Sequence, residues 1–333
     1  MTFTMPAEWE AHERTWMAWP PNNYLLGESE VEAEAARTTW AAVANTVVKY
    51  EPVSVLATTD QLEIARAYLH PSIEIIESEL DDAWMRDSGP TFVKDESGNL
   101  VAVNWIFNGW GAQPWATWEK DALVAPFIGK LSGAAVSDSF LINEGGGIHV
   151  NGAGAVLLTE TVQLGAGRNE HLSREEVEAE IHAKLGTNKA IWVKRGLTRD
   201  YDGYGTRGHI DIVACFASEN VILFHDQQDP SHPDFEVSKE VRQTLEAAGN
   251  FEVIGVPAPT VLRDEEGFVD YSYINHYIVN GAVILCSFDD PNDEVAKKIL
   301  EDAYPGREIV LVDAREIFAR GGGIHCITQQ QPA

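Results

Sequence analysis

Basic side chains are scarce in this chain of 333 residues. It has 24 Lys and Arg against 52 Asp and Glu, which gives a formal charge of −28 at pH 7. Such a charge repels nucleic acids and anionic membrane surfaces and attracts cations. The composition therefore argues against a nucleic-acid or membrane partner and is compatible with a cationic small-molecule substrate. It is equally compatible with a charge that serves only solubility.

Cysteine and long apolar runs are scarce as well. Three cysteines, an odd number, do not make a disulfide framework. No apolar run approaches the roughly 18 residues of a membrane span, and residues 1–30 lack the basic start and apolar stretch of a secretory signal. We therefore expect a reduced, cytoplasmic protein. Cys215 and Cys286 lie in apolar, strand-like runs and are expected to be inert core residues.

No low-complexity tract or linker divides the chain, so we expect one domain over residues 1–333. Two or more strands for each helix do not fit a simple alternating parallel sheet and indicate a small mixed unit used several times. Capping signals and periodicity predict helices near 29–48, 60–69, 117–132, 173–185, 235–248 and 293–303. Strands are predicted at 53–58, 73–78, 100–107, 155–159, 210–216, 220–225, 251–256, 282–288 and 308–313.

The string Gly-Gly-Gly-Ile-His occurs twice, at 145–149 and 321–325. A rare string that recurs indicates a duplicated structural unit. The first copy continues into Val150 and the second into Cys326, which makes Cys326 the leading candidate for a nucleophile. The string lacks the Lys-Ser/Thr of a phosphate-binding loop and the glycine spacing of a dinucleotide site, so we do not expect a nucleotide.

Other reactive residues gather in three segments, 81–90, 143–150 and 206–216. In the last of these, His209 and Asp211 are two residues apart and would point to the same face of an extended strand. Asp87 and Glu144 add further carboxylates. Several acids around one cysteine raise the pKa of its thiol, which makes sense if the substrate brings a positive charge. A guanidinium held by two carboxylates would supply that charge and help to stabilise the thiolate.

Each of these residues also has a purely structural interpretation. A turn aspartate such as Asp87 is more often a local cap, and a lone strand histidine such as His209 is usually structural. His325 would point to the opposite face of a strand from its neighbouring cysteine, and its counterpart His149 has no cysteine beside it. We therefore expect both to make structural hydrogen bonds. No second His/Asp cluster completes a metal site with His209 and Asp211, so no metal is expected.

Taken together, these segments resemble the agmatine deiminase family of the pentein superfamily of guanidine-modifying enzymes. The resemblance covers nearly the whole chain and is carried by MPAEWEAHERTWMAWP, DDAWMRDSGPTFV, FNGWG, EGGGIHV, TRGHIDIVACF, YSYINHYIVN and GGGIHCITQQQP. It implies an α/β fold, a five-bladed propeller of ββαβ-type units with pseudo-fivefold symmetry. It also implies a hydrolase of putrescine biosynthesis that acts on the C–N bond of a linear amidine, without metal or organic cofactor.

The resemblance also implies roles for individual residues. Cys326 would be the nucleophile and His209 the general acid and base, turning agmatine into N-carbamoylputrescine and ammonia through a covalent thiouronium. Asp87 and Asp211 would hold the guanidinium, and Glu144 would support His209. Trp84 and Trp110 would form the aromatic walls of the pocket. For Trp110 a plain packing role is equally compatible with the sequence.

Several positions depart from the family pattern. The acidic residue often found four positions before the catalytic histidine, which helps to recognise the distal amine of agmatine, is Gly205 here. Arg207 lies nearby and is a further candidate for substrate binding, where it would favour a carboxylate-bearing tail. The remaining departures are Gly147, Asn151, Ile212 and Gly323.

Three alternatives stay open at this point. The guanidino substrate could be arginine or peptidyl-arginine instead of agmatine. A non-catalytic propeller scaffold would not need Asp87, His209, Asp211 and Cys326. A metal-dependent ureohydrolase would need paired His/Asp ligand motifs that the sequence lacks. The sequence also leaves open whether copies of the chain form a homo-oligomer.

Overall fold

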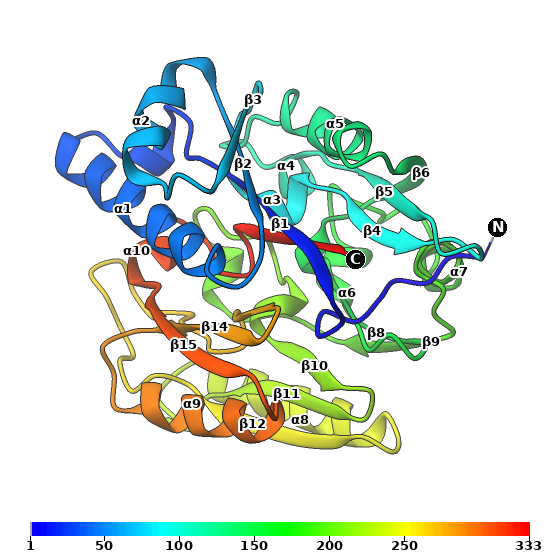
Figure 1. Ribbon diagram of the computed structural model, residues 1–333. Coiled ribbons are helices and arrows are strands. Elements are labelled where there is room, and N and C mark those ends of the chain that lie inside the picture. Colours follow the sequence, from blue (N-terminus) through cyan, green and yellow to red (C-terminus); the bar gives the residue numbers. More distant parts are fainter. Residues whose placement is uncertain (1) are drawn as a thin grey trace.

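The computed structural model describes residues 2–333 and contains five small sheets. In each sheet the first strand pairs antiparallel with the second, and the second pairs parallel with the third across a helical connection. Figure 1 shows these units following one another around the molecule, from blue through cyan, green and yellow to orange. The expected arrangement of five ββαβ units is confirmed.

Four units are continuous in the sequence. The first has β4 (Thr91–Lys94), β5 (Leu100–Ile106), α5 (Val124–Leu131) and β6 (Ala135–Ile142). The second has β7 (Ile148–Val150), β8 (Ala155–Thr159), α7 (Arg174–Leu185) and β9 (Lys189–Val193). The third has β10 (Ala214–Ser218), β11 (Val221–Asp226), α8 (Asp234–Ala247) and β12 (Glu252–Pro257). The fourth has β13 (Tyr277–Val279), β14 (Ala282–Ser287), α9 (Asn292–Ala303) and β15 (Glu308–Asp313).

The fifth unit is assembled from the two ends of the described chain. β16 (Thr328–Pro332) pairs antiparallel with β1 (His12–Ala18), which leads through α1 (Glu30–Val47) to the parallel strand β2 (Val53–Ala57). A further helix, α2 (Leu62–Tyr68), and strand, β3 (Glu74–Glu77), extend this sheet. The buried Trp16 indole donates a hydrogen bond to Gln331 Oε1 across the junction, at 2.9 Å. The segment that carries Cys326 is thereby fixed to the start of the chain.

The local sequence explains the elements that carry most of the packing. The interior strands β2 and β8 are buried at every position and apolar except for Ser54 and Thr159, as expected for strands covered on both faces. Helix α7 begins with a capping box of Ser173 and Glu176 and ends at Gly186, whose φ of 69° is left-handed. These signals, read in the sequence, are confirmed. None of the helices formed by residues 2–333 is both long and apolar enough to cross a membrane.

The sequence predictions of the strands were incomplete. The short first strands β4, β7, β13 and β16, of three to five residues each, were not predicted. The strands β1, β6 and β9 were missed as well. The strand predicted from residue 210 begins only at Ala214, because Ile210–Ile212 forms a 3₁₀ turn. In every unit the residues just before the first strand form a turn instead of extended chain, and these turns hold the candidate site.

Cys215 and Cys286 are buried in β10 and β14, 3% and 0% exposed, as predicted. We expect Cys215→Ala to lower the free energy of unfolding by about 1 kcal/mol, because it leaves a small void in the core. Turnover should be nearly unchanged. Denaturant unfolding together with an activity assay would measure both, and inactivation without unfolding would contradict the core assignment.

Candidate active site

The turns that precede the first strands of the five units meet at one place. They carry, in chain order, Asp87 in α3 (Met85–Ser88), Glu144, His209 with Asp211, Asn275, and Cys326. All of these side chains are buried, with at most 5% of their surface exposed. The structure thus brings together the nucleophile, histidine and three carboxylates that the sequence singled out. It adds Asn275, which lies in a quoted motif but was assigned no role.

The repeated glycines allow these turns to approach one another closely. A Cβ on Gly145 would lie 2.2 Å from the carbonyl oxygen of Arg86. A Cβ on Gly146 would lie 2.4 Å from His209 Nδ1, and one on Gly323 would lie 2.3 Å from Asn275 Oδ1. Since real Cβ atoms do not approach other atoms so closely, any side chain here would displace the candidate catalytic residues.

Cys326 lies in a turn within hydrogen-bonding range of two neighbouring side chains. Its Sγ is 3.6 Å from Asp211 Oδ2 and accepts a hydrogen bond from Asn275 Nδ2 at 3.3 Å. Burial, together with the negative charges of Asp211 and Asp87, raises the pKa of Cys326 well above that of an ordinary thiol. In the free protein at neutral pH, Cys326 is therefore a thiol.

His209 is surrounded by carboxylates. Its Nε2 is 3.3 Å from Glu144 Oε2, and its Nδ1 is 3.8 Å from Asp87 Oδ1. Burial lowers the pKa of His209, but the charges of Asp87 and Glu144 outweigh it and raise the pKa to about 9. His209 is therefore an imidazolium at neutral pH. Among residues 2–333 its Nδ1 has no hydrogen-bond partner, so one acidic N–H remains free to donate.

Glu144 is held in its ionised form by Arg168. The Nε of Arg168 lies 3.0 and 3.1 Å from the two carboxylate oxygens, and Nη2 donates to the Thr206 carbonyl at 2.7 Å. Burial raises the pKa of Glu144, but Arg168 and His209 outweigh it and keep that pKa below its usual range. Nothing in the local sequence marks Arg168, because its partner comes from a different turn.

Asp87 accepts two hydrogen bonds that fix its carboxylate. They come from the backbone N–H of Gly146 at 3.0 Å and from the indole N–H of Trp110 at 2.9 Å. Burial and the nearby negative charges of Asp211 and Glu144 raise the pKa of Asp87 to about 6. Trp110 thus orients a candidate catalytic carboxylate, and it also stacks on Trp115 at 5.2 Å.

Asp211 belongs to a second buried network. Its Oδ2 is 2.8 Å from His325 Nδ1, while His325 Nε2 is 2.8 Å from Glu8 Oε1, which in turn pairs with Arg86. Burial opposes ionisation of Asp211, but His325 keeps its pKa below the usual value. Oδ1 of Asp211 has no protein partner within the described chain, so one lone-pair edge is available to a ligand.

Two expectations about local geometry were wrong. His209 and Asp211 were expected to be alternate residues of an extended strand. They line the same cavity, but they do so because Ile210–Ile212 forms a 3₁₀ turn. His325 likewise lies in a turn and not on the opposite face of a strand. Its hydrogen bonds are made as expected, but one of them goes to Asp211, beside Cys326. Its counterpart His149 accepts a hydrogen bond from the backbone of Phe216, at 3.2 Å.

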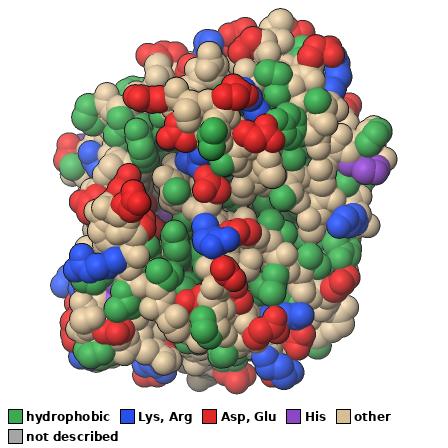
Figure 2. Space-filling view, turned by 90° about the vertical axis from the view of Figure 1, so that its left-hand side faces the viewer, with side chains coloured by type: hydrophobic (Ala, Val, Ile, Leu, Met, Phe, Trp, Pro, Cys, Tyr) green, Lys and Arg blue, Asp and Glu red, His purple; other side chains and the backbone are tan. Residues whose placement is uncertain are grey.

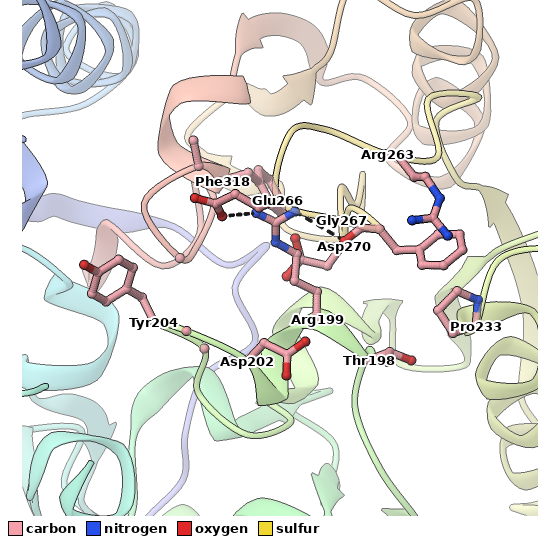
Figure 3. A pocket seen from close by; sticks show the side chains of 15 residues that line it. Thr198, Arg199, Asp202, Tyr204, Pro233, Arg263, Glu266, Gly267, Asp270 and Phe318 are labelled. Atoms are coloured by element: carbon pink, nitrogen blue, oxygen red, sulfur yellow. Dashed lines mark hydrogen bonds and ion pairs between the residues drawn. The ribbon is translucent and has the colours of Figure 1, made fainter. Parts of the chain in front are cut away.

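Aromatic side chains cover Cys326. Trp84, Trp110 and Tyr204 line a small cavity at the thiol, and His209 and Asp211 line a second small cavity that also includes Cys326. The ring of Tyr204 stacks on Tyr24 at 4.4 Å. Beyond Tyr204 a wider cavity of about 540 Å³ opens, bordered by the segments 198–205 and 263–270 (Figure 3).

Arg207 is not brought into this group. Its guanidinium donates to the backbone carbonyls of Ala166 and Gly111, at 3.3 and 3.5 Å, and it lines neither cavity next to Cys326. Gly205 has no space for a side chain, because a Cβ there would lie 2.1 Å from the carbonyl oxygen of Asp200.

No group of three or more His, Cys, Asp and Glu side chains in residues 2–333 has the arrangement of a metal site. Acidic side chains are spread over the face of the molecule shown in Figure 2, with fewer basic ones between them. The excess of acidic residues in the sequence is thus visible on this face of the surface.

A family model described as Porphyromonas-type peptidyl-arginine deiminase matches residues 4–332. The chain belongs to this family. The protein named "Putative agmatine deiminase" of Streptomyces coelicolor is 58% identical over 100% of this chain and 99% of its own length. The agmatine deiminase of Pseudomonas aeruginosa strain LESB58 is 39% identical over 99% of this chain and 96% of its own length. The family that the motifs indicated is confirmed.

Solved structures agree with the fold. The structure of an agmatine deiminase of Enterococcus faecalis superposes with a TM-score of 0.90 at 31% identity, covering 99% of this chain and 96% of that chain. The similarity extends over nearly the whole chain. The family and its relatives identify a hydrolase that acts on the C–N bond of a guanidine.

The titration of Asp87 and His209 predicts a bell-shaped dependence of kcat/KM on pH. Asp87 has a raised pKa of about 6, so binding of a cation is lost as pH falls through that value. His209 has a raised pKa of about 9, so its acidic proton is lost as pH rises through that value. Steady-state rates from pH 5 to 10 would test this. A profile that stays flat between pH 7 and 5 would contradict the assignment for Asp87.

Substitution of Gly146 should disturb the site without unfolding the protein. A Cβ at this position meets His209 Nδ1 at 2.4 Å and Asp87 Oδ1 at 2.9 Å. We expect Gly146→Ala to lower kcat/KM at least about 100-fold, because displacing catalytic groups by about 1 Å has that effect. Gly129→Ala, buried in α5 with its nearest neighbours at 3.0 Å and beyond, is the matched control and should retain activity. Circular dichroism would establish folding, and nearly full activity of Gly146→Ala would refute the packing argument.

Proposed function

We propose that this chain is an agmatine deiminase, which hydrolyses agmatine to N-carbamoylputrescine and ammonia through a covalent intermediate on Cys326. One observation carries the proposal: a buried thiol lies among Asp87, Asp211 and Glu144 with a protonated His209 beside it. Such a group of charges suits a small cation that carries the carbon to be attacked. The names of relatives that match along the full length support the same substrate.

Binding of the guanidinium would use the free edges of two carboxylates. Asp211 has an unpartnered Oδ1, and Asp87 is oriented by Trp110 and Gly146. Carboxylates pair with a planar guanidinium through charge-assisted hydrogen bonds. The arriving positive charge offsets the negative charges that keep Cys326 protonated, so the pKa of its thiol falls, the proton passes to solvent, and the thiolate forms next to its target.

The first half of the reaction would release ammonia. The thiolate of Cys326 attacks the central guanidinium carbon and forms a C–S bond, which gives a tetrahedral adduct. The His209 imidazolium donates its proton to the departing amino group, and the C–N bond breaks. Ammonia leaves, and the substrate remains attached to the sulfur as a thiouronium.

The second half would return the enzyme to its starting state. His209, now neutral, takes a proton from water, and the resulting hydroxide attacks the same carbon. The C–S bond breaks and the sulfur leaves as thiolate. The hydroxyl proton passes through solvent to this thiolate, which restores the thiol of Cys326 and gives the ureido product. Glu144, fixed by Arg168, would hold His209 in position and stabilise its charged form in both halves.

The side chains that cover Cys326 favour a free small molecule as the substrate over an arginine residue within a protein. Only 4% of Cys326 is exposed, and Trp84, Trp110 and Tyr204 close the space beside it. A polypeptide chain would need a more open cleft. A thiol nucleophile also suits a reducing cytoplasm, which we propose as the setting, and all three cysteines are free.

The test compares substrates and variants in one assay. Wild-type protein, Cys326→Ala and His209→Ala would be treated with EDTA and incubated with agmatine, arginine and a blocked arginyl peptide. Ureido product would be measured by mass spectrometry and ammonia by a coupled enzyme. We expect N-carbamoylputrescine from wild type, no turnover by Cys326→Ala, and a loss of at least about 10²-fold for His209→Ala.

Other outcomes would revise specific parts of the proposal. Product from arginine or the peptide alone would keep the chemistry and reject agmatine as the substrate. Residual turnover by Cys326→Ala above about 1% would reject the covalent mechanism. Sensitivity to EDTA with release of urea would indicate a metal-dependent ureohydrolase instead.

A further inference from the structure

The small cavity that His209 and Asp211 line beside Cys326 is called the inner cavity. Three residues line both this inner cavity and the wide outer cavity: Asp270, Phe318 and Gly321. Asp270 is the one charged residue among them. It is half-buried in the segment that leads into β13, and Figure 3 shows it among the residues around the outer cavity. Its position lies between the site of reaction and the path to the surface.

Within the described part of the chain, the carboxylate of Asp270 makes no direct hydrogen bond or ion pair with another side chain, although the charge of Arg199 acts on it from a greater distance. Its neighbours are already engaged. Asp200 accepts hydrogen bonds from the backbone N–H groups of Thr206, Gly208 and His209 and from the Thr206 hydroxyl. Arg199 pairs with Asp264 and Glu266, each at 2.7 Å. Burial and the nearby charge of Asp200 raise the pKa of Asp270 to about 7, while the charge of Arg199 lowers it. Asp270 is therefore a carboxyl group in the cavity wall that a bound cation would hold in its ionised form.

We propose that Asp270 accepts the distal ammonium of agmatine and so determines which guanidine tails the enzyme takes. The inference rests on the proposed function and deepens it. With the guanidinium held at Cys326, the methylene chain would extend past Phe318, which offers apolar surface along both cavities. The ammonium would then reach the border between the two cavities, where Asp270 lies.

Arg199 and Arg263 also line the outer cavity, but Arg199 is paired with Asp264 and Glu266, and Arg263 lies over the ring of Phe268. Neither of them lines the inner cavity that Asp270 borders. Gly205 cannot carry a side chain beside the backbone of Asp200, and Arg207 donates to the carbonyls of Gly111 and Ala166. A substrate carboxylate placed at this border would face the negative charges of Asp270 and Asp200. The tail expected from the geometry is therefore cationic, and not the carboxylate-bearing tail that Arg207 suggested in the sequence.

The experiment compares agmatine with butylguanidine, which has the same chain and no amino group. Steady-state kcat/KM would be measured for both substrates with wild-type enzyme, Asp270→Asn and Asp202→Asn. Asp202 is the matched control because it is an exposed carboxylate that lines only the outer cavity. We expect wild type to prefer agmatine and Asp270→Asn to reduce kcat/KM for agmatine about 10- to 100-fold, the usual effect of losing a charge-assisted contact. The loss for butylguanidine should be at least about tenfold smaller, and Asp202→Asn should keep the preference of wild type.

The outcomes separate the inference from the proposed function. Equal losses for both substrates would show that Asp270 only maintains the structure, and an unchanged preference would show that it does not contact the tail. Either result, with wild type active on agmatine, overturns the inference and leaves the proposed function intact. Wild-type enzyme that does not deiminate agmatine would overturn both.

Discussion

The close approach of five turns at the centre of the propeller is the constraint on which the rest of the structure depends. Each turn precedes the short first strand of a unit, and the glycines at 145–147 and 321–323 let neighbouring turns come within reach of one another. Once these turns meet, their polar side chains are buried together, and buried charges must be paired. The ion pairs around Cys326 follow from this packing as much as from catalysis.

The charges at the centre explain how the protein holds an unreactive thiol ready for reaction. The carboxylates of Glu8, Asp87, Glu144 and Asp211 are matched by the cationic side chains of Arg86, Arg168, His209 and His325. A thiolate would add a negative charge with no partner, so the thiol keeps its proton. In the proposed mechanism a guanidinium would restore the balance when the thiolate forms. Reactivity would then depend on the arrival of a cation of the right shape, and the sulfur would be protected from other electrophiles until it arrives.

Most of the helices, the repeated unit and the reactive side chains could be predicted from the sequence. The positions of those side chains relative to one another could not. Helix α7 was predicted closely because its cap and its final glycine are local signals. The strands β7 and β13, of three residues each, are too short to show an alternating pattern. Arg168 and Asn275 were missed because their partners come from other turns, and such contacts depend on the assembled propeller.

Substitutions are expected to have different effects in the inner part of the site, around Cys326, and at its border with the outer cavity. Around Cys326, every polar side chain contacts another from a different unit, so one substitution leaves a buried charge without its partner. At the border with the outer cavity, Asp270 contacts no partner within the described chain. A change at Asp270 would therefore cost little stability. If Asp270 binds the substrate tail as proposed, the tail specificity could change without disturbing the buried ion pairs around Cys326, because the two sets of side chains depend on different contacts.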